Sequence, residues 1–179
     1  MRTLDLSKID PARDPYWRGR LGYYAAAAAV VARRPEGRVL ELGAYSTPLV
    51  PDADLMDRED PFGLDRLVYL HDARITPWPV PTARYDGFVA LQVFEHLDGC
   101  QPAAWAEVER ITTTWALLSI PYRWPAGRSP GHDGLDDETL RKWTGRAPAS
   151  RRLVVDPGAK YGRLLALYDL TDTGVSWTI

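Results

Sequence analysis

Short apolar runs recur along residues 38–168 and predict the strands of a sheet. Seven runs, each of four to six residues, occupy 38–43, 53–57, 67–72, 86–91, 115–120, 152–155 and 163–168. Short apolar runs bounded by turn residues are typical of strands buried on both faces of a parallel sheet. The last two runs are joined by 156–162, whose proline and glycines predict a hairpin.

Helical segments lie before and between these strands. The alanine-rich stretch 25–34 predicts a helix, because alanine has the highest helix propensity and the Pro-Glu-Gly at 35–37 ends it. Apolar residues recur at helical spacing in 102–112, where Pro102 suits the first turn. A third helix is predicted to begin at Asp136, whose carboxylate can cap it. This order of elements predicts an α/β fold with a mostly parallel sheet and one antiparallel strand.

The chain length of 179 residues favours a single domain covering 1–179. We divide it into an N-terminal helical cap over 1–37, a core over 38–168 and a tail over 169–179. The net charge of -2 gives no overall basic field, so nucleic acid is not an expected partner. No apolar run approaches the ~20 residues of a membrane span.

Cysteine content and the N-terminal residues suggest a compartment. Cys100 is the only cysteine, which excludes an internal disulfide and a zinc cluster built from cysteines. Residues 1–5 lack the apolar stretch of a signal peptide. We therefore expect a cytoplasmic protein.

Acidic and polar residues follow the predicted strands, where open α/β sheets bind their ligands. The first strand ends with Glu41 and Gly43, the second with Asp57 and the third with Asp72, and residues 92–96 follow the fourth. A carboxylate after the second strand can accept hydrogen bonds from both hydroxyls of a ribose. These positions favour a nucleoside-containing ligand.

Two of these segments resemble motifs of a known family. Residues 39–43 resemble the first motif of class I S-adenosylmethionine-dependent methyltransferases, and 85–97, ending in Glu95-His96-Leu97, is similar to their fourth. Residues 117–121 and the terminal hairpin are similar to the strands that follow. The resemblance covers roughly 38–168 and implies a Rossmann-like methyltransferase fold with a seven-stranded, mostly parallel sheet, a C-terminal antiparallel hairpin and S-adenosylmethionine as cofactor.

The resemblance also implies roles for single residues. Glu41 and Gly43 would border the methionine part of the cofactor, and Asp57 would bind its ribose. Asp72 would lie near the adenine amino group, with Ala73 beside the ring. The residues implied for the rest of the site are Leu91 and Gln92, lining the methionine portion, and His96, facing the substrate.

The first motif departs from the usual family pattern. Gly43 is followed by Ala-Tyr-Ser-Thr-Pro, a Gly-x-Tyr-x-x-Pro-Leu variant found in small bacterial members, whereas the usual loop has two or three glycines. A side chain as large as Tyr45 must point away from the pocket or fill part of it. The prolines between Gly43 and Asp57 leave little room for the customary first helix.

Acid–base and acceptor-binding residues are predicted near the later strands. His96 is the leading candidate for a general base, because the ordinary pKa of histidine lies near neutrality. The alternative for His96 is a structural role, and His132 beside Asp133 is the second candidate base. Residues that open the loop after the fifth strand are suited to shape an acceptor pocket: Tyr122, Arg123 and Trp124.

We predict methyl transfer to a small-molecule acceptor, with oxygen favoured over nitrogen or carbon, because no insertion is present that would recognise a macromolecule. One alternative is a degenerate methyltransferase fold that binds a partner without catalysis. A nicotinamide-dependent enzyme is disfavoured, because no Gly-x-Gly-x-x-Gly follows the first strand. No metal site is predicted, because no histidines or acids have the i, i+3 or i, i+4 spacing of metal-binding helices. The acceptor and the oligomeric state stay open.

Overall fold

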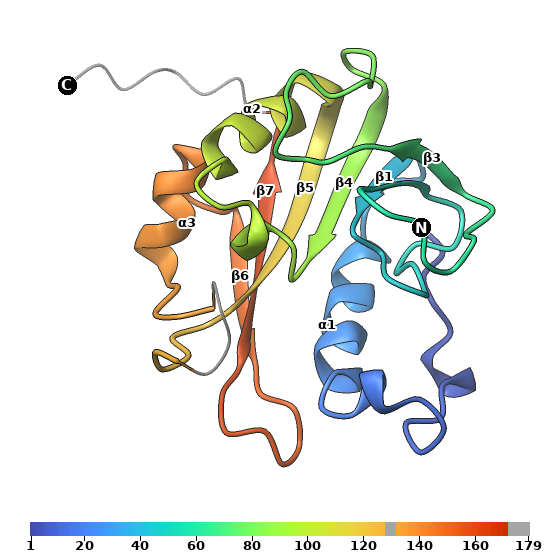
Figure 1. Cartoon of the computed structure of the whole chain (residues 1–179), viewed down its shortest axis with the longest axis vertical. Helices are drawn as coiled ribbons and strands as arrows, with labels where there is room; N and C mark the ends of the chain where they lie inside the picture. Colours follow the sequence, from blue (N-terminus) through green and yellow to red (C-terminus); the bar gives the residue numbers. More distant parts are fainter. Residues whose placement is uncertain (128–131, 172–179) are drawn as a thin grey trace.

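The computed structural model describes residues 1–127 and 132–171 and contains one seven-stranded sheet (Figure 1). The predicted tail therefore lies mostly outside the described residues. The strands are β1 Val39–Leu42, β2 Asp54–Asp57, β3 Leu67–Leu70, β4 Tyr85–Leu91, β5 Thr112–Pro121, β6 Ser150–Val154 and β7 Arg163–Asp169. The α-helices are α1 Leu21–Val31, α2 Gln101–Ile111 and α3 Asp137–Thr144, and the short 3-10 helices are η1 Leu6–Lys8, η2 Pro15–Trp17 and η3 Phe94–His96.

The strands lie in the order β3-β2-β1-β4-β5-β7-β6. The strands β1 to β5 pair in parallel, and β7 runs antiparallel to both β5 and β6. This arrangement confirms the predicted mostly parallel sheet with a terminal hairpin. The strand order reverses between β1 and β4, which is where open α/β sheets form a ligand-binding crevice.

Helices cover both faces of the sheet, with α2 and α3 on one side and α1 on the other (Figure 1). Successive residues of each central strand point to opposite faces, so Phe88 packs toward α2 while Val89 packs toward α1. Both side chains are fully buried. This two-sided burial explains why the central strands read as continuous apolar runs rather than alternating ones.

The connections β1–β2, β2–β3 and β3–β4 contain no α-helix; all three lie within the described residues. The predicted loss of the first helix is therefore confirmed. Glu41 on β1 holds the shortened connection in place, because its carboxylate accepts hydrogen bonds from the backbone N–H groups of Leu49 and Val50 at 2.9 and 3.1 Å. Burial raises the pKa of this carboxyl to about 7.

Helices α1 and α3 each begin where a carboxylate accepts hydrogen bonds from the first N–H groups of the helix. The side chain of Asp136 accepts hydrogen bonds from the N–H groups of Glu138 and Thr139, which confirms the predicted start of α3. Helix α1 begins at Leu21, four residues before the predicted start at residue 25. The carboxylate of Asp156, from the β6–β7 hairpin, accepts hydrogen bonds from the N–H groups of Gly22 and Tyr23 at 2.6 and 3.3 Å and so caps this earlier start. No helix in the described part of the chain is long and apolar enough to cross a membrane.

Candidate functional site

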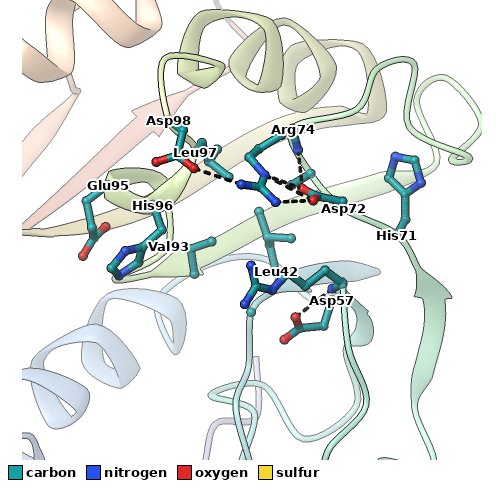
Figure 2. A pocket seen from close by; sticks show the side chains of 13 residues that line it. Leu42, Asp57, His71, Asp72, Arg74, Val93, Glu95, His96, Leu97 and Asp98 are labelled. Atoms are coloured by element: carbon teal, nitrogen blue, oxygen red, sulfur yellow. Dashed lines mark hydrogen bonds and ion pairs between the residues drawn. The ribbon is translucent and has the colours of Figure 1, made fainter. Parts of the chain in front are cut away.

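A cavity of about 550 Å³ lies at the carboxyl ends of β1 to β4. This volume is within the range of small-molecule and cofactor sites. Four of the predicted cofactor residues line it: Gly43, Asp57, Asp72 and Ala73. Figure 2 shows Asp57 and Asp72 on one side of this cavity and His96 on the other.

At Gly43 the loop after β1 packs against the segment after β4. Its backbone is left-handed, with φ of 68°, and a Cβ at this position would lie 2.6 Å from Val93 Cγ2. Only glycine meets both demands without strain. The single glycine of the first motif is therefore the one that the cavity geometry requires.

Asp57 ends β2 and presents a half-buried carboxylate to the cavity. Its Oδ1 accepts a hydrogen bond from the backbone N–H of Arg58 at 2.8 Å. Burial is the main cause that raises the pKa of Asp57 above its ordinary value, although this hydrogen bond opposes the shift. A ligand that donates hydroxyl hydrogen bonds would offset the cost of burying this charge.

Asp72 is held by an ion pair rather than left open. The guanidinium of Arg74 donates to both of its carboxylate oxygens, at 3.0 Å for Nε–Oδ1 and 2.6 Å for Nη2–Oδ2. The same Arg74 binds Asp98 at 2.9 Å, which links the β3 and β4 sides of the cavity (Figure 2). The hydrogen bonds from Arg74 lower the pKa of Asp72 to about 2.

A second cavity of about 350 Å³ lies beside the first, and Gly43 and His96 line both. The predicted cofactor residues Leu91 and Gln92 line this smaller cavity rather than the larger one. Glu41 lines neither, because its side chain faces the backbone of the β1–β2 connection. The two cavities meet at the end of β1, so two ligands could approach each other there.

Gln92 follows β4 with a left-handed backbone, φ of 60°, which is uncommon for a residue other than glycine. Its N–H donates to the hydroxyl of Ser119 at 3.0 Å, and its Oε1 accepts from Arg163 Nε at 3.2 Å. Contacts to two neighbouring strands therefore hold this conformation. Such over-determined strain is characteristic of binding sites.

Aromatic side chains from the N-terminal cap and from the loop after β1 form the rim of the smaller cavity. Tyr45 has φ of 53° and stacks on Tyr16, with ring centroids 4.2 Å apart, and its other neighbour is Phe62 at 4.7 Å. Tyr45 therefore lies at the rim, with 44% of its surface exposed. Tyr16 both packs and lines the cavity, so the cap contributes directly to the site.

The two predicted bases come together although they lie on different segments. The Nε2 atoms of His96 and His132 are 3.2 Å apart. Burial lowers the pKa of both imidazoles, and their proximity lowers that of His132 further. Both rings are therefore favoured in the neutral form, which is the form able to accept a proton or bind a cation.

The predicted acceptor residues separate into two groups. Trp124 lines the smaller cavity, where its ring lies edge-on to His132 at 5.5 Å and its Nε1 donates to Gly162 O at 2.9 Å. Arg123 instead lines a surface hollow beside α3, and the hydroxyl of Tyr122 donates to Asp137 at 2.9 Å. Only Trp124 of the three is in position to contact an acceptor in this cavity.

Three residues that were not predicted as site residues lie at or beside the site: Arg20, Glu95 and Arg163. Arg20 and Arg163 line the smaller cavity, while Glu95 lines the larger one. Glu95 belongs to the Glu-His-Leu phrase, so that phrase was the available signal. Arg163 begins an ordinary apolar strand, and no local pattern marks it.

No protein-family model matches the sequence, and no curated protein matches it. Solved structures do match. NodS, an N-methyltransferase from Bradyrhizobium japonicum solved with S-adenosylhomocysteine, is 14% identical, has a TM-score of 0.63, and the match covers 87% of this chain and 92% of that one. A chain from the complex of the Haloferax volcanii Trm112 methyltransferase activator with a methyltransferase is 16% identical, with a TM-score of 0.65 and coverages of 92% and 95%.

A SAM-dependent methyltransferase from Aquifex aeolicus has a TM-score of 0.57 and 16% identity, over 89% of this chain and 99% of that one. The fold is that of the class I S-adenosylmethionine-dependent methyltransferases. This confirms the fold predicted from the two motifs. In this methyltransferase fold, the larger cavity, which Gly43 and Asp57 line, lies where the strand order reverses between β1 and β4.

Proposed function

We propose that this protein is an S-adenosylmethionine-dependent methyltransferase that acts on a small molecule, with oxygen as the favoured acceptor atom. The observation that carries the proposal is the junction of two cavities at Gly43 and His96. Methyl transfer requires two ligands held in line, and two adjoining cavities provide the positions for both. The proposal includes a cytoplasmic location, which is consistent with a single unpaired cysteine.

The residues of the larger cavity fit the cofactor. Asp57 offers acceptors for the ribose hydroxyls, and Ala73 offers a small buried surface beside a ring. Gly43 lets the backbone approach the methionine end. S-adenosylmethionine would supply a methyl group on a sulfonium, which is a good leaving group.

The smaller cavity suits an acceptor with an aromatic or planar body and a negative charge. Trp124 provides a flat apolar surface, and Arg20, whose guanidinium lies over the Tyr16 ring at 4.3 Å, provides a positive charge at the same rim. Arg163 adds a second guanidinium, largely offset by Asp156 at 3.4 Å. A carboxylate on the acceptor would pair with Arg20.

His96 is in position to accept the proton that an oxygen acceptor loses. When bound beside the acceptor, S-adenosylmethionine would supply the methyl group that the acceptor oxygen takes up. The acceptor proton passes to the imidazole of His96, whose lowered pKa favours the neutral, accepting form. Protein groups otherwise serve to align the two ligands and exclude water.

A catalytically inactive binding module is the second candidate, and one observation favours it. Arg74 already occupies both carboxylate oxygens of Asp72, so this acid is not free to receive an adenine amino group as the resemblance implies. If Arg74 keeps this position, the larger cavity loses one expected polar contact.

Calorimetric titration with S-adenosylmethionine and S-adenosylhomocysteine tests the proposal. Wild-type protein should bind with a Kd of about 1–100 μM, and Asp57→Ala should weaken binding at least about tenfold, roughly 1.4 kcal/mol. Asp60→Ala is the matched control, because Asp60 is an exposed acid in the neighbouring turn outside the larger cavity. Absence of heat from folded wild-type protein would favour the inactive module.

A further inference from the structure

A buried carboxylate without a partner lies beside the two histidines. The side chain of Glu95 is buried, with 4% of its surface exposed, and neither of its oxygens has a hydrogen-bond partner among the described residues. Leaving a carboxylate in this state costs free energy unless a cation or donor compensates it. One ligand atom each from Glu95, His96 and His132 lies within 4.8 Å of the other two.

The separation of the two imidazole nitrogens matches coordination of one ion. Nitrogen ligands about 2.0–2.1 Å from a tetrahedral ion lie about 3.3–3.4 Å from each other, and an octahedral ion brings them to about 2.9 Å. The observed distance between His96 Nε2 and His132 Nε2 is 3.2 Å, between these limits. A direct hydrogen bond is the competing explanation of this distance, but it leaves both oxygens of Glu95 without a partner.

We propose that Glu95, His96 and His132 form a binding site for a divalent transition-metal ion. Two imidazoles and one carboxylate are the ligands that Zn²⁺ and Fe²⁺ accept, whereas Mg²⁺ and Ca²⁺ prefer oxygen ligands alone. Spacing along a single helix does not detect this cluster, because Glu95 and His96 follow β4 while His132 follows β5. The ion can enter from solvent through the exposed side of His96.

The surrounding residues hold the ligands and set the local charge. The Trp124 ring lies edge-on to His132 at 5.5 Å, and the neighbouring Asp133 accepts a hydrogen bond from the backbone of Gly127 at 3.1 Å. The positive charge of Arg163 acts on both Glu95 and His132, and the carboxylate of Asp156 offsets it at 3.4 Å. Because burial favours a proton on Glu95 in the metal-free protein, binding of the ion would release that proton and leave the carboxylate charged.

The metal site would take part in the proposed methyl transfer, and this catalytic role rests on the proposed function. Three protein ligands leave coordination positions open, as in catalytic metal sites, and His96 and His132 line the acceptor cavity. A bound ion would hold an acceptor that carries a hydroxyl beside a second oxygen, such as a carboxylate or carbonyl, and would lower the pKa of that hydroxyl. With the ion bound, the proton would leave to water instead of passing to His96, because Nε2 of His96 would be a ligand of the ion.

Cobalt titration of untagged, chelator-stripped protein tests the metal site directly, with visible absorption of Co²⁺ as the readout and Zn²⁺ as competitor. We expect one equivalent to bind, and His132→Asn and Glu95→Gln each to weaken binding at least tenfold. His71→Asn is the matched control, since His71 is the only other histidine and its Nε2 contacts the carbonyl of Ile75 instead. Circular dichroism establishes that each variant is folded, and His96→Asn replaces any variant that is not.

The result that overturns the site is folded wild-type protein that binds no Co²⁺ or Zn²⁺, or binding that is unchanged in His132→Asn. A parallel calorimetric titration with S-adenosylhomocysteine separates this proposal from the proposed function. Cofactor binding without metal binding overturns the metal site alone. Metal binding without cofactor binding supports the site and overturns the methyltransferase role.

Discussion

Arg163 at the start of β7 donates a hydrogen bond from Nε to Oε1 of Gln92 at 3.2 Å, which joins the ends of β7 and β4 at the wall of the smaller cavity. The same guanidinium contacts the carbonyl of Gly19 at 2.8 Å and the carboxylate of Asp156 at 3.4 Å. Asp156 in turn caps α1. A single buried side chain therefore connects the N-terminal cap, the terminal hairpin and the candidate site.

Replacement of Arg163 should destabilise the whole domain. Arg163→Met leaves the buried Asp156 without its cationic partner, so we expect the free energy of unfolding to fall by about 3–5 kcal/mol in urea denaturation. Arg151→Met is the matched control, because Arg151 pairs with Asp137 at the surface, where the loss of an ion pair changes stability little. Equal losses in the two variants would contradict the role given to Arg163.

The close approach of Gly43 to Val93 should make substitutions at these two positions depend on each other. Gly43→Ala should lower the free energy of unfolding by about 2–4 kcal/mol, from left-handed backbone strain and from the clash with Val93. Val93→Ala in the same chain should recover the part due to the clash. Gly63→Ala is the control, since Gly63 has φ of 60° and open space around it, so only strain of about 1 kcal/mol is expected. No recovery in the double variant would show that Val93 is not the obstacle.

Glu95 predicts a dependence of stability on pH in metal-free protein. Burial raises its pKa from 4.5 to about 8, so between these values the folded state holds a proton that the unfolded state has lost. Stability from this group therefore falls as pH rises through that range, by up to about 1.4 kcal/mol per unit.

Glu95→Gln removes this titration. We expect its stability relative to wild type to be higher at pH 8 than at pH 5, measured by urea denaturation in the presence of a chelator. Glu138→Gln, at an exposed position on α3, should give the same difference from wild type at both pH values. A constant difference for Glu95→Gln as well would show that this carboxyl is not buried without a partner.

The central strands were predictable because burial on both faces makes each of them a short apolar run, and the order of motifs identified the fold. The start of α1 was not, because Gly22 has poor helix propensity and its N–H is satisfied by Asp156, 134 residues away in the sequence. A contact over such a distance leaves no local pattern.

Contacts between distant segments also limited the prediction of the candidate site. The structure brings Asp57 and Asp72 to the cavity, since the ends of parallel strands meet at one edge of the sheet, but the carboxylate of Glu41 faces the backbone of the β1–β2 connection. The proximity of His132 to Glu95 depends on how the loop after β5 returns over β4, which spacing along the chain does not determine. Arg123 was expected beside Trp124 in one pocket, but its backbone has φ of 52° and its side chain lines the hollow beside α3.

The most direct test of the central claim is a crystal structure of the protein with S-adenosylhomocysteine. The account predicts ribose hydroxyls within hydrogen-bond distance of the Asp57 carboxylate and the sulfur atom at the junction of the two cavities, beside Gly43. A ligand bound elsewhere, or one whose sulfur points away from the smaller cavity, would contradict it.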